Sequence, residues 1–141
     1  MTAESFARQN AGDRLFAGLA GRSTPLPHVV TLPWPDAILS PNARPHWAPK
    51  AKAVKMARLD TAWSVRAAFV TRPHWSHAVV SLTFNPPDRR RRDLQNCIAS
   101  AKALVDGIAD ALGIDDSKFD CRYVMGEPVK GGAVRVEIRP I

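Results

Sequence analysis

Residues 94–113, LQNCIASAKALVDGIADALG, decide the fold of this 141-residue chain. Apolar residues recur along this stretch at intervals of three and four, which is the period of an amphipathic helix, and Gly113 stands where a left-handed residue would end it. The apolar stripe consists of Leu94, Cys97, Ile98, Ala101, Leu104, Val105, Ile108 and Leu112. The opposite side carries Asn96, Ala99, Ser100, Lys102 and Asp106. The stretch therefore predicts one continuous helix with a buried side and a polar side.

Patterns on both sides of this helix predict an α+β domain. Residues 28–32 and 78–84 are β-prone, and residues 119–125 and 134–139 alternate between apolar and polar side chains. We expect the last two of these strands to form an antiparallel hairpin joined through residues 128–132. The expected order is β-α-β-α-β-β, a mixed, mainly antiparallel sheet with two helices packed on it.

The other helix is expected over residues 50–70. Its apolar repeat predicts a buried side, made of Val54, Ala57, Thr61, Val65 and Ala68. Lysines and arginines occupy much of the remaining surface, so this helix is expected to carry a basic side.

A chain of this length forms one domain with its own core. Residues 28–141 are the expected domain, and residues 1–27 are interpreted as a partly ordered N-terminal extension. The apolar residues Phe6, Leu15, Phe16 and Leu19 could line a short helix in this extension, although three glycines weaken it.

Charge is segregated along the chain. The net charge is +7 and the isoelectric point is about 10.1, which favours an anionic partner. Residues 44–92 contain eleven lysines and arginines against two acids, whereas residues 93–120 contain two against six. The sequence thus predicts a basic surface beside an acidic cluster.

Several classes of protein are disfavoured by what the sequence contains. Cys97 and Cys121 have no metal-ligand spacing, which favours small core residues in a reducing compartment, and the four histidines show no catalytic spacing. No apolar run approaches the ~20 residues that span a bilayer, and the N-terminus does not resemble a secretion signal. We therefore expect a cytoplasmic, nucleoid-associated protein without a membrane partner.

Four consecutive arginines, Arg89, Arg90, Arg91 and Arg92, lie between a strand that ends near Asn85 and the predicted helix. Such a block repels itself, so contact with phosphate is the favoured interpretation and a solvated surface is the alternative. Lys50, Lys52 and Lys55 are expected to add phosphate contacts. Trp47 beside them either stacks on an exposed base or packs on the core.

Carboxylates follow the arginines at both ends of the helix. Asp93 stands at its start, and Asp115 and Asp116 follow its end. Carboxylate and amide oxygens are ligands of Mg²⁺, and a polyanion held by arginines beside such a metal describes a nuclease. The alternatives are that Asp93 serves only as a helix N-cap and that Asp115 and Asp116 form a solvated turn. Lys102 could reach a phosphate, or could be an exposed lysine without a role.

The stretch Pro87–Asn96, followed by Asp115 and Asp116, resembles the RusA family of Holliday junction resolvases. Residues 32–42 and residues 120–132 are similar to that family's opening and closing segments, so the resemblance covers roughly residues 29–139. It implies a RusA-like domain that forms a homodimer, binds four-way DNA junctions and cuts opposed strands in DNA recombination and repair. Family members depend on Mg²⁺, for which Mn²⁺ can substitute, and are often encoded by phages and prophages.

The family's functional residues fall on particular positions of this chain. The resemblance implies that Asp93, Asn96 and Asp116 belong to the catalytic set and that Asp115 adds charge to the metal site. Gln95 stands where the family has another aspartate, so an uncharged ligand replaces a charged one. The family's lysine position is Ala99, and Lys102, one helical turn further, resembles a displaced equivalent.

These observations predict an endonuclease in which Asp93, Asp116, Asp115 and Gln95 hold Mg²⁺ and Lys102 and Asn96 assist. The arginines and the three lysines would contact backbone phosphates. The rival hypothesis is a junction-binding protein that cuts weakly or not at all, because Gln95 has replaced an acid. A second rival is a general basic nucleic-acid binder or a toxin-like ribonuclease.

Overall fold

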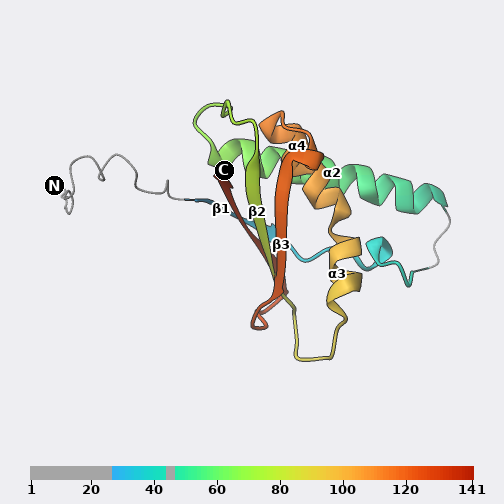
Figure 1. The fold of residues 1–141 in the computed structure, drawn as a ribbon. Helices are drawn as coiled ribbons and strands as arrows, with labels where there is room; N and C mark the ends of the chain where they lie inside the picture. The colour runs from blue at the N-terminus through green and yellow to red at the C-terminus, as the bar shows by residue number, and fades with distance from the viewer. Residues whose placement is uncertain (1–26, 44–46) are drawn as a thin grey trace, which may run out of the picture.

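The computed structural model describes residues 27–43 and 47–141 (Figure 1). The predicted N-terminal extension therefore lies outside the described residues, apart from Pro27. The elements, in chain order, are β1 (His28–Pro33), η1 (Ala37–Leu39), α2 (Trp47–Ala68), β2 (Ala78–Asn85), α3 (Leu94–Ser100), α4 (Lys102–Leu112), η2 (Asp116–Lys118), β3 (Phe119–Met125) and β4 (Ala133–Pro140). This is the α+β order that the sequence predicts. No helix in the described part of the chain is long and apolar enough to cross a membrane.

The four strands form one mixed sheet in the order β1-β4-β2-β3. β4 lies between β1 and β2 and is antiparallel to both, while β2 and β3 are parallel. Two of the three pairings are antiparallel, as predicted. The predicted hairpin is wrong, because β2 separates the last two strands.

The segment after β3 explains why no hairpin forms. It crosses the end of β2, where the amide of Gly126 donates to the Phe84 carbonyl at 2.8 Å and the amide of Val129 donates to the Pro86 carbonyl at 2.9 Å. The side-chain amide of Asn85 donates to the Glu127 carbonyl at 2.8 Å. The connection is thereby fastened to β2, and it delivers β4 to the far side of that strand. The alternating sequence of two strands does not reveal such a crossing.

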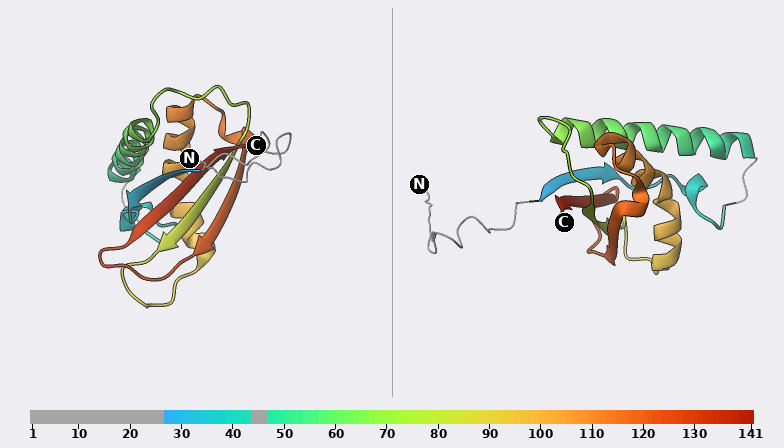
Figure 2. Two further views of the ribbon diagram at one scale, coloured as in Figure 1. Left: turned by 90° about the vertical axis from the view of Figure 1, so that its left-hand side faces the viewer. Right: turned by 45° about the horizontal axis from the view of Figure 1, so that its top comes forward.

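All the helices cover the same face of the sheet (Figure 2). The side chains that point toward them form the core, and they include Leu32, Val80, Leu82, Phe84, Val134, Val136 and Ile138. The other face carries more polar residues such as Thr31, Ser81 and Arg135, which are exposed or half-buried. One buried face and one solvated face produce the period-two pattern of the strands.

The predicted continuous helix is bent into α3 and α4. Ala101 separates them with a backbone at φ −93° and ψ 3°, outside the helical range. The hydroxyl of Ser100 donates to the Asn96 carbonyl at 2.9 Å, a side-chain bond to the preceding turn that bends helices. Ala101 is completely buried, so packing holds the bend in place. Gly113 ends α4 at φ 69°, as predicted.

The α2 helix is buried only in its second half. Thr61, Ala62 and Val65 are its buried residues, whereas Val54 and Ala68 of the predicted buried side are exposed. The first half extends past the sheet (Figure 1), and none of its residues is buried. Helical periodicity locates one side of a helix, but it does not show how much of that side another element covers.

Candidate active site

Residues 86–93 connect β2 to α3 and form the arginine loop, which Arg92 holds in shape. The guanidinium of Arg92 donates to the Asp88 carboxylate at 2.8 Å and to the backbone carbonyls of Asp88 and Arg90, both at 3.1 Å. It also lies over the Trp34 ring, 5.6 Å from the centroid. Hydrogen bonds from Arg92 and from the Arg90 amide lower the pKa of Asp88 to about 2. The side chain of Arg92 is 15% exposed, so it serves the loop itself.

The other three arginines face solvent. The side chains of Arg89 and Arg90 are 84% and 80% exposed, and Arg91 is also exposed. Arg89 lies 4.0 Å from the Glu127 carboxylate, an exposed pair that contributes little to stability. The loop thus presents three guanidinium groups to an anion, while its fourth is held by the protein.

Asp93 is the N-cap of α3. Its carboxylate accepts a hydrogen bond from the Gln95 amide at 3.2 Å, which confirms the capping role that the sequence suggested. Asn96 lies half-buried on the first turn of α3, and Gln95 is exposed. Asp93 and Asn96 both line a hollow of about 290 Å³ between α3 and the chain that follows β1.

Lys102 contacts two carboxylates that come from different parts of the chain. Its ammonium group donates to Asp106 at 2.7 Å and to Asp116 at 2.9 Å. These hydrogen bonds raise the pKa of Lys102 above its ordinary value, the bond to Asp106 most strongly. Gly113 ends α4 and turns the chain back, which places Asp116, the first residue of η2, beside the start of α4. We call Lys102, Asp106 and Asp116 the lysine–carboxylate cluster.

Asp106 was not among the predicted site residues. The signal was present in the sequence, because Asp106 follows Lys102 by four residues and side chains at that spacing meet on a helix. Lys102 and Asp116 were both predicted to belong to the catalytic set, and the ion pair between them brings these two residues together. Asp115, its neighbour, turns away: its carboxylate caps η2 and accepts from the amide of Ser117 at 3.0 Å and from its hydroxyl.

The cluster borders a hollow of about 470 Å³ that β3 closes on one side. Cys121 and Tyr123 line it together with Lys102, Asp116 and three residues of the helices, Ile98, Ala99 and Val105. Burial raises the pKa of Tyr123 to about 12, and burial also raises the pKa of Cys121. The Tyr123 hydroxyl thus keeps its proton to a higher pH than an ordinary tyrosine does.

The predicted site residues do not all converge. Asp93 lies before α3 and Asp116 contacts Lys102 beyond the end of α3, and the two line different hollows. Within residues 27–43 and 47–141, no three histidine, cysteine, aspartate or glutamate side chains are grouped so that they could hold a metal. The cage expected from Asp93, Gln95, Asp115 and Asp116 is therefore not assembled in this structure.

The three lysines of α2 occupy different surfaces. Lys50 lines a further hollow with Lys102 and Asp106, which brings the basic side of α2 to the lysine–carboxylate cluster. Lys52 and Lys55 are exposed. Trp47, at the first position of α2, is 77% exposed, so packing on the core was the wrong alternative for it.

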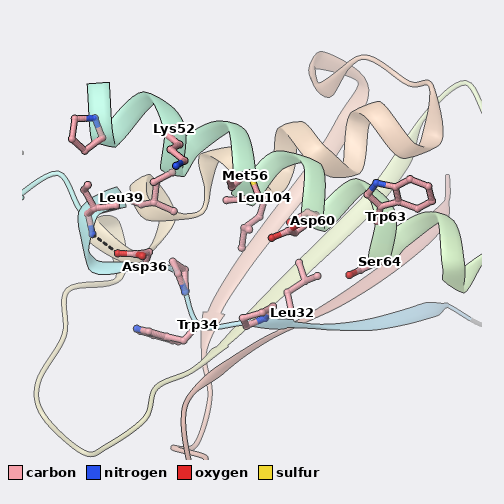
Figure 3. A pocket seen from close by; sticks show the side chains of 17 residues that line it. Leu32, Trp34, Asp36, Leu39, Lys52, Met56, Asp60, Trp63, Ser64 and Leu104 are labelled. Carbon is pink, nitrogen blue, oxygen red and sulfur yellow. Dashed lines mark hydrogen bonds between the residues drawn. The ribbon is translucent and has the colours of Figure 1, made fainter. Parts of the chain in front are cut away.

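A further hollow was not anticipated from the sequence. It measures about 950 Å³ and runs between α2 and the chain from Leu32 to Leu39 (Figure 3). Met56 and Trp63 line it and are 48% and 70% exposed. Their spacing of seven residues places them on one side of α2, which is the signal that could have indicated an unpartnered apolar surface.

Comparison with known proteins places the chain in a family without assigning an activity. No family model matches it. A protein of Xylella fastidiosa that is described as an uncharacterized protein is 40% identical over 116 residues, which cover 79% of this chain and 76% of that protein. This chain belongs to the same family as that protein.

Proposed function

We propose that this protein is a metal-dependent endonuclease that cuts four-way DNA junctions. The observation that carries the proposal is the lysine–carboxylate cluster, in which Lys102 contacts both Asp106 and Asp116. Lys102 and Asp106 belong to α4, which follows the arginine loop and α3. A basic loop, a lysine and paired carboxylates are the groups that phosphodiester hydrolysis at a metal requires. The resemblance of residues 87–96 to the RusA family supports the same activity.

The chemistry of the cluster fits Mg²⁺. The carboxylates of Asp106 and Asp116 both contact the same positive group, the ammonium group of Lys102. Mg²⁺ in enzymes is commonly held by one or two carboxylates and completed by water and substrate phosphate. Asp106 and Asp116 would hold the metal, which would polarise the phosphate and lower the pKa of a bound water. Asp93 and Asp115, which cap α3 and η2, are not needed for such a two-carboxylate set.

The remaining residues would position the DNA and balance its charge. Arg89, Arg90 and Arg91 would bind backbone phosphates, because their guanidinium groups are exposed. Lys102 would offset the charge on the phosphate that is cut. Lys50 lines the hollow that Lys102 and Asp106 share, so it would bind the adjoining backbone.

Cleavage of a labelled four-way junction tests the proposal. We expect wild-type protein with Mg²⁺ or Mn²⁺ to cut two opposed strands. Lys102→Ala should slow cutting by about 100-fold while junction binding persists, because a positioned charge is lost from the site of reaction. Lys118→Ala is the matched control, since this exposed lysine lies two residues after Asp116 but outside the cluster. Binding of the junction by the wild type without any nicking would reject the nuclease.

A junction-binding protein without cleavage is the second candidate. It is favoured by the exposed Gln95 at the position of a family acid and by the small number of carboxylates in the cluster. Under this alternative the wild type binds the junction but does not cut it, and Gln95→Asp creates or strongly raises cutting. Competition with linear DNA and with RNA at stated salt tests the remaining rivals, because binding through phosphate alone has little preference for structure.

We further propose that two copies associate through the groove side of α2. Lys52, Met56 and Asp60 lie at four-residue intervals along this side and are exposed. A twofold axis through Met56 that sets two α2 helices antiparallel would place Lys52 of each copy opposite Asp60 of its partner. The exposed Trp63 would then be covered by the other copy. Figure 3 shows these side chains along the groove.

Sedimentation tests this dimer. Asp60→Lys should separate the copies, because Lys52 would then oppose a lysine, and the double change with Lys52→Asp should restore the dimer. A wild-type protein that sediments as a monomer at assay concentration would reject this surface. Glu127→Lys, an equal change of charge at an exposed residue that does not line the groove, is the control.

A further inference from the structure

The hollow beside Asn96 separates two parts of the chain. One wall is the segment after β1 and includes Trp34, Ser40 and Asn42, and the other wall is α3 with Asn96 and Ser100. Arg91 of the arginine loop stands at the same hollow. Its volume of about 290 Å³ equals that of roughly ten water molecules at ~30 Å³ each. A nucleobase, with about eight to eleven heavy atoms, is of that size, whereas a base pair is not.

The polar groups of this hollow suit the edge of a base. The hydroxyl of Ser40 accepts from the backbone amide of Asn42 at 3.2 Å, and the hydroxyl of Ser100 donates to the backbone carbonyl of Asn96. These bonds use backbone groups of the two asparagines, and no hydrogen bond joins either side-chain amide to another described residue. A side-chain amide both donates and accepts, so it can pair with the edge of an unpaired base.

This hollow and those of the lysine–carboxylate cluster share lining residues. Ser100 lines both it and the next hollow, in which Lys102 and Asp106 stand, and Lys102 also lines the hollow of Asp116. From Asn96 to Lys102 the chain advances six residues, which is at most about 9 Å at 1.5 Å per residue because the bend at Ala101 shortens the distance. Successive nucleotides of one strand rise by about 3.4 Å. Asn96 in this hollow and Lys102 in the cluster are thus one to three nucleotides apart along a strand.

We propose that this hollow is a base-binding subsite, which takes the base of an unpaired nucleotide close to the phosphate at Lys102. This inference rests on the proposed function, because it names how that site selects its DNA. Trp34 supplies aromatic surface, and Asn42 and Asn96 bind the base edge. Asp36 and Asp93 add acceptors to the lining, so bases that carry an exocyclic amino group are preferred over thymine.

Binding of a short single strand in the absence of divalent metal tests the subsite without cleavage. Trp47, Trp63 and Trp75 are changed to phenylalanine, so that Trp34 is the single fluorescent reporter. We expect a strand with a base at every position to change Trp34 fluorescence and to bind about tenfold more tightly than a strand with one abasic residue. Asn42→Ala should weaken binding of the complete strand about tenfold and leave binding of the abasic strand unchanged.

Thr71→Ala is the matched control, because it removes an exposed polar side chain that does not line this hollow. Equal binding of the complete and abasic strands would overturn the subsite, as would an Asn42→Ala variant that behaves like Thr71→Ala. A junction that is cut normally by Asn42→Ala, with unchanged preference for bases at the cut, would also overturn it and leave the nuclease intact. Base-dependent binding without junction cutting would retain the subsite and reject the nuclease.

Discussion

Tyr123 is the single tyrosine of the chain, so its ionisation can be observed without interference. Burial raises its pKa to about 12, compared with about 10 for an unfolded tyrosine. We expect the ultraviolet absorbance of the folded protein to show a tyrosinate midpoint near 12. In denaturant the midpoint should return to about 10. A folded midpoint near 10 would mean that β3 and the helices do not enclose the side chain.

The same residue predicts the direction of a pH effect on stability. The folded pKa of Tyr123 lies above the unfolded pKa, so the folded state holds the proton more tightly. The contribution is complete below about pH 10 and is lost as the pH rises toward 12. The unfolding free energy of Tyr123→Phe should therefore fall less than that of wild type between about pH 10 and 12. Urea denaturation at several pH values would measure this difference.

Individual residues also mark the limit of what the sequence reveals about the site. The capping role of Asp93 follows from local sequence alone, because N-cap chemistry involves residues two positions apart. The contact between Lys102 and Asp116 depends on the turn after Gly113 and on the bend at Ala101. Asp106 lies within the helix and not at its ends, but its position four residues after Lys102 is also a local signal.

At the scale of elements, Gly107 sets the distance between α4 and α2. A β-carbon at this position would lie 2.5 Å from the Arg58 carbonyl oxygen and 2.8 Å from the β-carbon of Thr61. We expect Gly107→Ala to lower the unfolding free energy by about 1–3 kcal/mol through overpacking. Ala109→Ser, a similar increase in size at a half-buried position of the same helix, should change it by less than about 0.5 kcal/mol. Equal effects in urea denaturation would contradict this contact.

An ion pair joins the same two helices. Arg58 donates to both carboxylate oxygens of Asp110, at 2.6 and 2.8 Å, and this contact lowers the pKa of Asp110. Because the pKa of Asp110 is lower in the folded state, the contact stabilises the protein at pH values above the pKa of the unfolded state, near 3.9. This stabilisation is lost as the pH falls through the pKa of the folded state. Asp110→Asn should therefore be less stable than wild type at neutral pH, and the difference should shrink in acid.

Asp120→Asn is the control for this pair. Asp120 contacts Arg122 at 2.7 Å, but the two residues belong to the same strand and their pair joins no separate elements. Loss of the Asp120–Arg122 pair should lower the unfolding free energy at neutral pH by less than loss of the Arg58–Asp110 pair. A difference between Asp110→Asn and wild type that persists unchanged at acid pH would show that the ion pair is not the cause.

The order of elements could be predicted from the sequence, but the strand pairing could not. Period-two and helical patterns located all four strands and the main helices to within a few residues. The hairpin was wrong because alternation within β3 and β4 does not specify their neighbours, and a seven-residue connection can either turn back or cross β2. The bend at Ala101 was missed because the apolar stripe continues through it.

At the scale of the whole molecule, the separation of charge predicts how DNA binding responds to salt. Each phosphate contact contributes about 0.9 to the slope of log affinity against log salt. Arg90→Ala should therefore reduce this slope by about one, since its side chain is 80% exposed and its contact with the Asp88 carboxylate is long, at 3.4 Å. Arg92→Ala should change the slope less and lower thermal stability, because Arg92 holds the loop and lies over Trp34. Equal slopes for the two variants in titrations across a salt series would contradict the distinction.

The place of β4 has a consequence for how the protein is made. The last strand of the chain is hydrogen-bonded on both sides, and β1, the first described strand, has no other neighbour in the sheet. During synthesis, residues 133–140 leave the ribosome after the other described strands, so β1 and β2 lack their shared partner until this segment has emerged. A chain that stops before Ala133 should be protease-sensitive, and a chain that extends through Pro140 should be protected.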